Sequence, residues 1–198
     1  MLIRQIIEAY PFQATRPPQP PQTRSEPKPQ INLEPVANIP LAQPLIQRAA
    51  QAGIKGIELA QFLAQVKHES WNFTRLQEVP QGTNYFRRYD PKHSPKQARS
   101  LGNKHQGDGQ RYRGRGYIQL TGRENYQRAG RALNIDLVNK PERAAEPQTA
   151  AAIAIWYWTN RVKPYVQDFM DTARVTKFIN PQLKGLADRE RNFRSLLA

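Results

Sequence analysis

The chain has 198 residues and a formal net charge of +14, from 30 Lys and Arg against 16 Asp and Glu. The absence of cysteine excludes structural disulfides and thiolate metal sites, and no apolar run approaches the ~20 residues of a membrane span. The charge indicates an anionic partner, which could be a nucleic acid, a membrane surface or an acidic cell wall, and the start of the chain lacks the features of a signal peptide.

Residues 1–44 are predicted to form an arm outside the globular domain. Residues 13–45 are dense in proline and glutamine, and because proline fixes φ and lacks an amide proton, neither helix nor central strand is expected there. We expect extended, polyproline-like chain that acts either as a spacer or as an arm that docks on a partner. Docking is favoured by apolar residues at helical spacing in the first dozen positions, namely Leu2, Ile3, Ile6 and Ile7.

Residues 45–198 show the pattern of a mainly helical globular domain. Helices are expected at LIQRAAQAG, which ends at Gly53, at ELAQFLAQVKHES and at residues 94–101. An irregular stretch rich in glycine and arginine follows at residues 102–116. Further helices are expected at RENYQRAGRALN, closed by Asn134, and at TAAAIAIWYWTN, DTARVTKFIN and GLADRERNFRSLL. The short run YIQLT is predicted to be a strand or an extended loop.

Glu69 is the candidate general acid. It stands at the end of a predicted helix, on the same face as Phe62 and Val66, because positions i, i+4 and i+7 superpose. Burial of an unpaired carboxylate favours its protonated form and raises its pKa, which a general acid requires near neutral pH. The alternative is a glutamate at a frayed helix end that faces solvent.

Glycosidases place a second carboxyl group across the scissile bond from the acid. Downstream candidates are few: Glu78, Asp90, Asp108 and Glu124. Glu78 follows Glu69 closely, in a segment that must leave the helix before Pro80, so it could face Glu69 across a groove. The alternative is a solvated loop carboxylate.

The run GDGQRYRGRGYIQLTGRENY, residues 107–126, combines glycines with arginines and tyrosines. The glycines permit tight turns and close backbone approach. If YIQLT is extended, Gln119 and Thr121 share one face, where they could hydrogen-bond an acetamido sugar and hold a water. The alternatives are a nucleic-acid-binding loop and a structural turn.

Four motifs occur in a characteristic order: HES at 68–70, the GDG-x-RYRGRGYIQLTGRENY run, the AIWYW helix and the VTKFIN…GLADR tail. Over residues 45–198 they resemble glycoside hydrolase family 19, the family of plant-type chitinases and many phage endolysins. The resemblance implies a lysozyme-like, mainly α-helical domain with a substrate cleft and an inverting mechanism. We expect no cofactor and no metal. The lack of cysteines favours the phage-type branch over the disulfide-bonded plant enzymes.

The resemblance also implies roles for individual residues. The proton donor falls on Glu69, the general base on Glu78 and the water-holding hydroxyl on Thr121. Substrate contacts are expected from Gln119, Asn125 and Asn180, and also from His68 and Tyr117. Inversion needs room for a water, which predicts carboxyl groups ~6.5–9.5 Å apart. The chain departs from the family at Ser70, Trp71 and Asn72, where many relatives have glycines.

These observations predict an endolysin- or lysozyme-like glycosidase that cuts the β-1,4 bonds of peptidoglycan. Chitinase is the alternative, but chitin is neutral, whereas peptidoglycan stems and attached wall polymers are anionic and cations crowd residues 87–115. The alternative of another class is an inactive virion component docked through residues 1–44. We expect phage tail or baseplate proteins as partners of that arm, and a location on the virion tail or in the host cytoplasm before lysis.

Two further classes conflict with the local sequence. A zinc protease with H-E-x-x-H would need a histidine at position 72, which is Asn72. The RYRGRGY run resembles arginine–glycine RNA-binding tracts, but it is short and flanked by apolar helices. We therefore expect no nucleic-acid partner.

Overall fold

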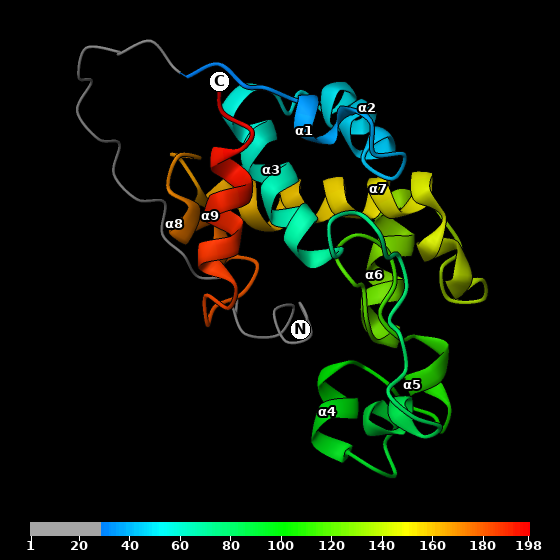
Figure 1. Cartoon of the computed structure of the whole chain (residues 1–198). Helices are drawn as coiled ribbons and strands as arrows, with labels where there is room; N and C mark the ends of the chain where they lie inside the picture. The colour runs from blue at the N-terminus through cyan, green and yellow to red at the C-terminus, as the bar shows by residue number, and fades with distance from the viewer. Residues whose placement is uncertain (1–28) are drawn as a thin grey trace.

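The computed structural model describes residues 29–198. The largest shares of its buried apolar core come from two helices, α3 (Gly56–Glu69) and α7 (Pro147–Tyr157). α2 (Gln43–Gln51) packs on α7, while α8 (Thr172–Lys177) and α9 (Leu186–Arg194) pack on each other and on α3 (Figure 1). Buried apolar side chains pack between these helices and supply the main stabilisation, and α3 also meets α8 and α9 through buried polar side chains. Within residues 29–198, no helix has both the length and the apolar character that a membrane crossing requires.

The predicted helices are present, and the residues predicted to end two of them adopt the left-handed backbone conformation typical of helix C-termini. Asn134 takes φ +54° directly after α6 (Arg123–Leu133), and Gly53 takes φ +71° after α2. α4 (Pro95–Ser100) begins with its proline in the first turn. The remaining elements are short: η1 (Tyr85–Tyr89), α5 (Asp108–Arg111), η2 (Pro141–Ala145), the π-helical turn η3 (Trp158–Val162) and η4 (Lys163–Tyr165).

The segment before α2 differs from the expectation of an extended arm. α1 (Glu34–Ala37) is a one-turn helix, so the prediction that no helix persists in residues 13–45 is wrong here: Pro35 lies in the first turn, where a missing amide proton breaks no helical bond. Val36 and Ala42 are fully buried, and the backbone of residues 30–32 bonds to that of residues 196–198. The expected boundary at residue 44 therefore lies inside the packed domain. The proposed docking helix in the first dozen residues lies outside the described residues.

The run YIQLT forms a tight turn and not an extended piece. Arg115 and Leu120 exchange backbone hydrogen bonds of 3.1 and 2.8 Å across it. Gln119 has φ +52°, in the left-handed region. The strand-like alternation expected to align Gln119 with Thr121 is therefore absent, and the structural-turn alternative describes this segment.

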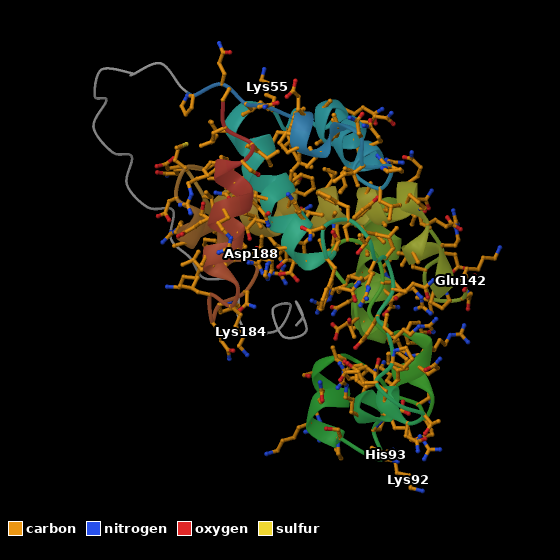
Figure 2. The ribbon with its side chains drawn as sticks, viewed as in Figure 1. Lys55, Lys92, His93, Glu142, Lys184 and Asp188 are labelled. Carbon is orange, nitrogen blue, oxygen red and sulfur yellow. The ribbon has the colours of Figure 1, made fainter. Side chains whose placement is uncertain are left out.

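Residues 79–111 form a smaller lobe that extends from the main body, with η1, α4 and α5 (Figure 1). Its own apolar cluster consists of Phe86, Tyr89 and Leu101. Lys92 and His93 stand at its far end (Figure 2). The lobe is thus a small packed unit with a polar outer surface.

Asp108 ties this lobe to the main body. Its carboxylate pairs with Arg123, the first residue of α6, at 2.6 Å. Burial acts to raise the pKa of Asp108, but hydrogen bonds from Arg123 and from the amides of His105 and Lys104 outweigh it, so the pKa lies below its usual value. The ion pair therefore persists at neutral pH.

Gly122 should be indispensable at the junction between the lobe and α6. Its φ is +93°, and an added Cβ would lie 2.5 Å from the carbonyl oxygen of Leu101. We expect Gly122→Ala to lower the free energy of unfolding by ~2–4 kcal/mol, because backbone strain and overpacking add. Gly82 is the matched control, since its φ is +107° but an added Cβ would meet nothing within 4 Å. Urea unfolding should show a smaller decrease in the free energy of unfolding for Gly82→Ala than for Gly122→Ala. Equal decreases would contradict a steric role for the contact with Leu101.

Candidate active site

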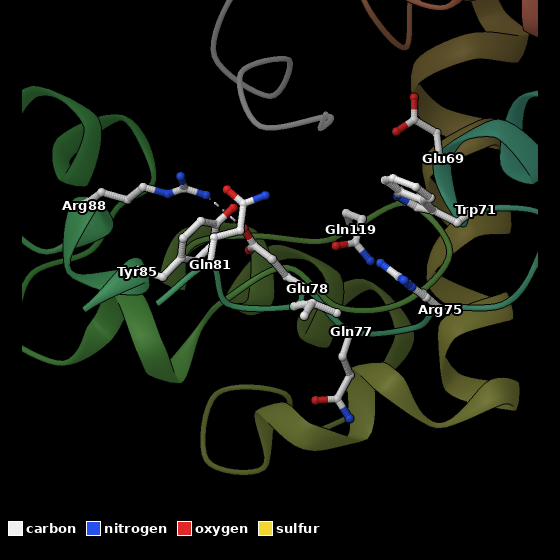
Figure 3. A pocket seen from close by; sticks show the side chains of 10 residues that line it. Glu69, Trp71, Arg75, Gln77, Glu78, Gln81, Tyr85, Arg88 and Gln119 are labelled. Carbon is white, nitrogen blue, oxygen red and sulfur yellow. Dashed lines mark hydrogen bonds and ion pairs between the residues drawn. The ribbon is translucent and has the colours of Figure 1, made fainter. Parts of the chain in front are cut away.

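A cleft of about 520 Å³ lies between the end of α3 and the smaller lobe (Figure 3). Both proposed catalytic carboxylates line it, Glu69 from α3 and Glu78 from the segment that leads into the lobe. In this view Gln119 lies between them. The other lining residues are Trp71, Arg75, Gln77, Val79, Gln81, Tyr85 and Arg88.

Glu69 lies on the buried face of α3 and is 8% exposed, so it does not project into solvent from a frayed helix end. This face of α3 is not purely apolar, however, because a buried arginine contacts it beside Glu69. Arg189 of α9, whose side chain is fully buried, donates to Oε1 of Glu69 and, at 2.7 Å, to Oε1 of Gln65. The carboxylate is therefore paired, which offsets much of the penalty for placing a charge in a dry region.

A chain of buried polar side chains holds this pair in place. Gln65 donates to Oε1 of Gln61 at 3.2 Å and to Oγ1 of Thr176 at 3.1 Å. Gln61 in turn donates to Oγ1 of Thr172 at 2.9 Å. The network joins α3 to α8, so the position of Glu69 depends on both C-terminal helices, α8 and α9.

Arg189 is the residue of the candidate site that the sequence analysis missed. A signal was present, because positions 189, 193 and 196 share one helical face and carry Arg189, Phe193 and Leu196, all buried. A charged residue on an apolar stripe predicts a buried partner of opposite charge. The pattern is the same one that identified Glu69.

Glu78 is also 8% exposed, and its carboxylate accepts from three donors in the part of the chain that the structure describes. The Tyr89 hydroxyl and the Arg88 guanidinium donate to Oε1 at 3.0 and 3.2 Å. The backbone amide of Gly114 donates to Oε2 at 3.0 Å, while the Glu78 amide donates to the Gly114 carbonyl at 2.9 Å. Such donors stabilise the ionised form, which is the form that a general base needs.

The other candidate carboxylates are engaged elsewhere. Asp90 accepts hydrogen bonds from the backbone amides of residues 107 and 109, Asp108 pairs with Arg123, and Glu124 pairs with Arg128 on the surface of α6. Among the described residues that line the cleft, Glu69 and Glu78 are the two acids. The described residues contain no group of three or more side chains suited to hold a metal ion.

Thr121 and Asn125 support the turn that carries Gln119 and do not themselves line the cleft. The Thr121 hydroxyl donates to the Gln119 carbonyl at 2.8 Å, and the Asn125 amide donates to the Thr121 carbonyl at 2.7 Å. Gln119 itself reaches the cleft wall. The water-holding role of Thr121 and the substrate contacts of Gln119 and Asn125 stay predictions.

Three further predicted contact residues lie away from the cleft lining. Tyr117 is fully buried, its hydroxyl donates to the Leu41 carbonyl at 2.6 Å, and burial raises its pKa to about 12. His68 Nδ1 lies 2.6 Å from Oδ2 of Asp188, and this hydrogen bond holds the pKa of Asp188 below its usual value. Asn180 is buried and accepts from the backbone amide of residue 182 at 3.1 Å. Their roles in substrate binding also stay predictions.

Comparison with known proteins places these features in a family. Residues 39–175 match the model of chitinase class I, glycosyl hydrolase family 19. A glycosyl hydrolase family 19 domain-containing protein of Haemophilus influenzae is 34% identical over 170 residues, which cover 73% of this chain and 80% of that protein. Endochitinase EP3 of Arabidopsis thaliana is 36% identical over 119 residues, 59% of this chain, and the match spans 40% of the plant protein.

The fold is shared with solved structures of the same group. Chitinase C of Streptomyces griseus aligns with a TM-score of 0.57 and 24% identity, covering 81% of this chain and 82% of that one. A class IV chitinase of family 19 from Zea mays aligns with a TM-score of 0.51 and 19% identity, covering 81% and 86%. These alignments establish the lysozyme-like helical architecture of the domain.

Replacement of Arg189 by an uncharged residue should leave the buried Glu69 carboxylate without its cationic partner. We expect Arg189→Met to lower the free energy of unfolding by ~3–5 kcal/mol, because the Glu69 carboxylate loses its partner while it remains buried. The double variant Arg189→Met with Glu69→Gln should recover part of that loss, since no buried charge is then left unpaired. Denaturant unfolding of the four proteins in the cycle measures the coupling. A free energy of unfolding for Arg189→Met within ~1 kcal/mol of the wild-type value would contradict the assigned pairing.

Proposed function

The chain belongs to glycoside hydrolase family 19, the chitinase class I family, and we propose that it hydrolyses β-1,4 bonds between the N-acetyl sugars of peptidoglycan with inversion. The observation that carries this proposal is the pair of buried carboxylates on one cleft, each with its own donors. The two glutamates have different surroundings, which suits an acid and a base that perform different steps.

The reactive form has a proton on the Glu69 carboxyl group, whose Oε1 still accepts from Arg189, and this proton passes to the glycosidic oxygen as the bond to the anomeric carbon breaks. Glu78 takes a proton from a water that attacks the same carbon from the opposite face, which inverts its configuration. After its proton has left, Glu69 is a carboxylate, and the neighbouring Arg189 guanidinium stabilises that charge without any rearrangement. The donors around Glu78 keep it ionised until it accepts the proton from water.

The charge of the smaller lobe supports peptidoglycan over chitin. Both acids of residues 79–111, Asp90 and Asp108, are buried and have hydrogen-bonding partners. The exposed charged side chains of the lobe are cationic: Arg87, Lys92, Lys96, Arg99, Lys104 and Arg111. A surface of one sign beside the cleft attracts an anionic polymer and loses this advantage as salt increases.

Chitin hydrolysis is the second candidate, because relatives such as Endochitinase EP3 are named for that activity. A cleft for N-acetyl sugars would accept either polymer. We further propose that the N-terminal segment tethers the domain to a phage tail or baseplate, so that the enzyme acts on the wall from the virion. This tether is supported by the apolar spacing and proline content of the sequence.

The clearing of purified peptidoglycan suspensions tests the function. Glu69→Gln and Glu78→Gln should each lower the initial rate at least ~10²-fold, because general acid and base catalysis are lost. Glu142→Gln is the control, an exposed carboxylate away from the cleft, and its rate should stay within about twofold. Circular dichroism confirms that each variant is folded. Clearing by the Glu69 variant would overturn the mechanism, and activity on chitin alone would favour the second candidate.

Gly114 provides a second test, because a Cβ at this position would lie 2.8 Å from Oε1 of Gln119 and 3.1 Å from Oε2 of Glu78. Both oxygens end side chains that can shift if their hydrogen bonds adjust, and Glu78 Cβ lies 3.3 Å from the added Cβ. We expect Gly114→Ala to lower kcat by ~10-fold or more through misplacement of the base, with a free energy of unfolding within ~1 kcal/mol of wild type.

Gly107→Ala is the matched control for that variant. Gly107 has φ +91°, and an added Cβ would meet nothing within 4 Å. This variant should show the opposite pattern, a loss of stability from backbone strain with kcat preserved. A Gly114 variant with normal kcat would contradict the assignment of Glu78.

A further inference from the structure

The lip of the cleft next to Glu69 carries an aromatic side chain that the mechanism does not use. Trp71 lines the cleft and is 63% exposed. Its φ is +53°, in the left-handed region, and Asn72 and Phe73 follow with φ of +57° and +58°. Residues with side chains rarely adopt this conformation, and strain of this kind concentrates at ligand-binding sites.

The surrounding structure holds the turn in this conformation. Phe73 is 1% exposed and anchors the turn in the core. The Ser70 hydroxyl accepts from the Phe73 amide at 3.1 Å and donates to the Val66 carbonyl at 2.8 Å, while the Asn72 amide donates to the carbonyl of residue 67. The indole of Trp71 is therefore presented to the cleft by a fixed backbone and not by a mobile loop.

Arg75 completes the lip. Its guanidinium lies over the Trp71 ring, 5.0 Å from the centroid, and its side chain is exposed at the cleft. Within residues 29–198, no acidic side chain forms an ion pair with Arg75. Arg88, the other cation of the cleft lining, already donates to Glu78. In Figure 3, Glu69, Trp71 and Arg75 follow one another along the same wall of the cleft.

We propose that Trp71 and Arg75 form a subsite for a sugar that carries a carboxylate on its 3-O-lactyl branch. The guanidinium covers one face of the indole and binds the carboxylate through its two parallel N–H groups, while the exposed remainder of the indole packs on the apolar face of the sugar ring. This inference rests on the proposed function and names the feature of the glycan that the cleft selects. Neutral chitin offers no carboxylate for Arg75.

The carboxylate has two possible sources in a wall glycan. It is the free lactyl acid where the stem peptide has been removed, and it belongs to the amino acids of the stem where the peptide is present. Both present a planar anion on the same branch of the sugar. The test therefore includes each form as a separate ligand.

Binding to an inactive background tests the subsite without turnover. Dissociation constants are measured for Glu69→Gln with three soluble glycans of equal length: peptide-free muramic glycan, the same glycan with stem peptides, and chitin oligomers. Added Arg75→Gln should weaken binding of at least one carboxylated glycan by ~10-fold, and the preference for that glycan over chitin should fall accordingly. The glycan that loses more affinity identifies the source of the carboxylate. Glu78→Gln provides a second background if the first is poorly folded.

Arg99→Gln is the matched control, because Arg99 is exposed on α4, lies outside the cleft lining and carries the same charge. It should change each dissociation constant by less than about twofold, since only the long-range field is altered. Equal effects of Arg75→Gln on acidic and neutral glycans, or no effect on either, would overturn the subsite. Failure of the wild-type protein to clear peptidoglycan would instead count against the proposed function.

Trp71→Gly separates recognition from stability. Glycine adopts a positive φ without strain, so the variant should melt no lower than wild type, although it loses the indole. Its preference for the carboxylated glycan should fall, because Arg75 loses its platform. An unchanged preference in this variant would overturn the role of the indole.

Discussion

The buried ion pair between Glu69 and Arg189 links the proposed general acid to the packing of the domain. Both side chains are almost without solvent contact, and removing two charges from water costs several kcal/mol per ion. That penalty is tolerable only where the remaining polar atoms are satisfied, which the buried glutamines of α3 and the threonines of α8 achieve. The contact of α9 with α3 therefore positions the Glu69 carboxylate, the proposed acid, in addition to contributing to the core.

The second carboxylate depends on a different part of the molecule. Glu78 is held by η1 through Tyr89 and Arg88, and by the backbone of Gly114 in the glycine-rich run. The proposed acid therefore belongs to the main body, whereas the proposed base is fixed by the smaller lobe and the turn beside it. It follows that the gap between them is set by how the lobe joins the body, where the pair of Asp108 with Arg123 acts.

The features that could be predicted from the sequence are those that depend on interactions between residues close together in the chain. The helices, the end of α6 at Asn134 and the burial of Glu69 depend on residues a few positions apart, so periodicity and end signals identify them. The partner of Glu69 lies 120 residues away in the chain, and no local pattern pairs the two. The turn at Gln119 and the packing of residues 30–44 were missed for the same reason, because the fold as a whole decides them.

Core packing accounts for only part of the left-handed turn that follows Glu69. Trp71, Asn72 and Phe73 have φ between +53° and +58°, a backbone region that favours glycine. Each such residue costs of order 1–3 kcal/mol, and the burial of Phe73 contributes ~1.5–3 kcal/mol, which is enough to offset its own strain. No comparable burial compensates Trp71, which is 63% exposed. The strain at Trp71 is instead offset by the anchored Phe73 and by the hydrogen bonds of the turn, including those that Thr74 donates to the Trp71 carbonyl, so the fold itself keeps an exposed indole beside the cleft.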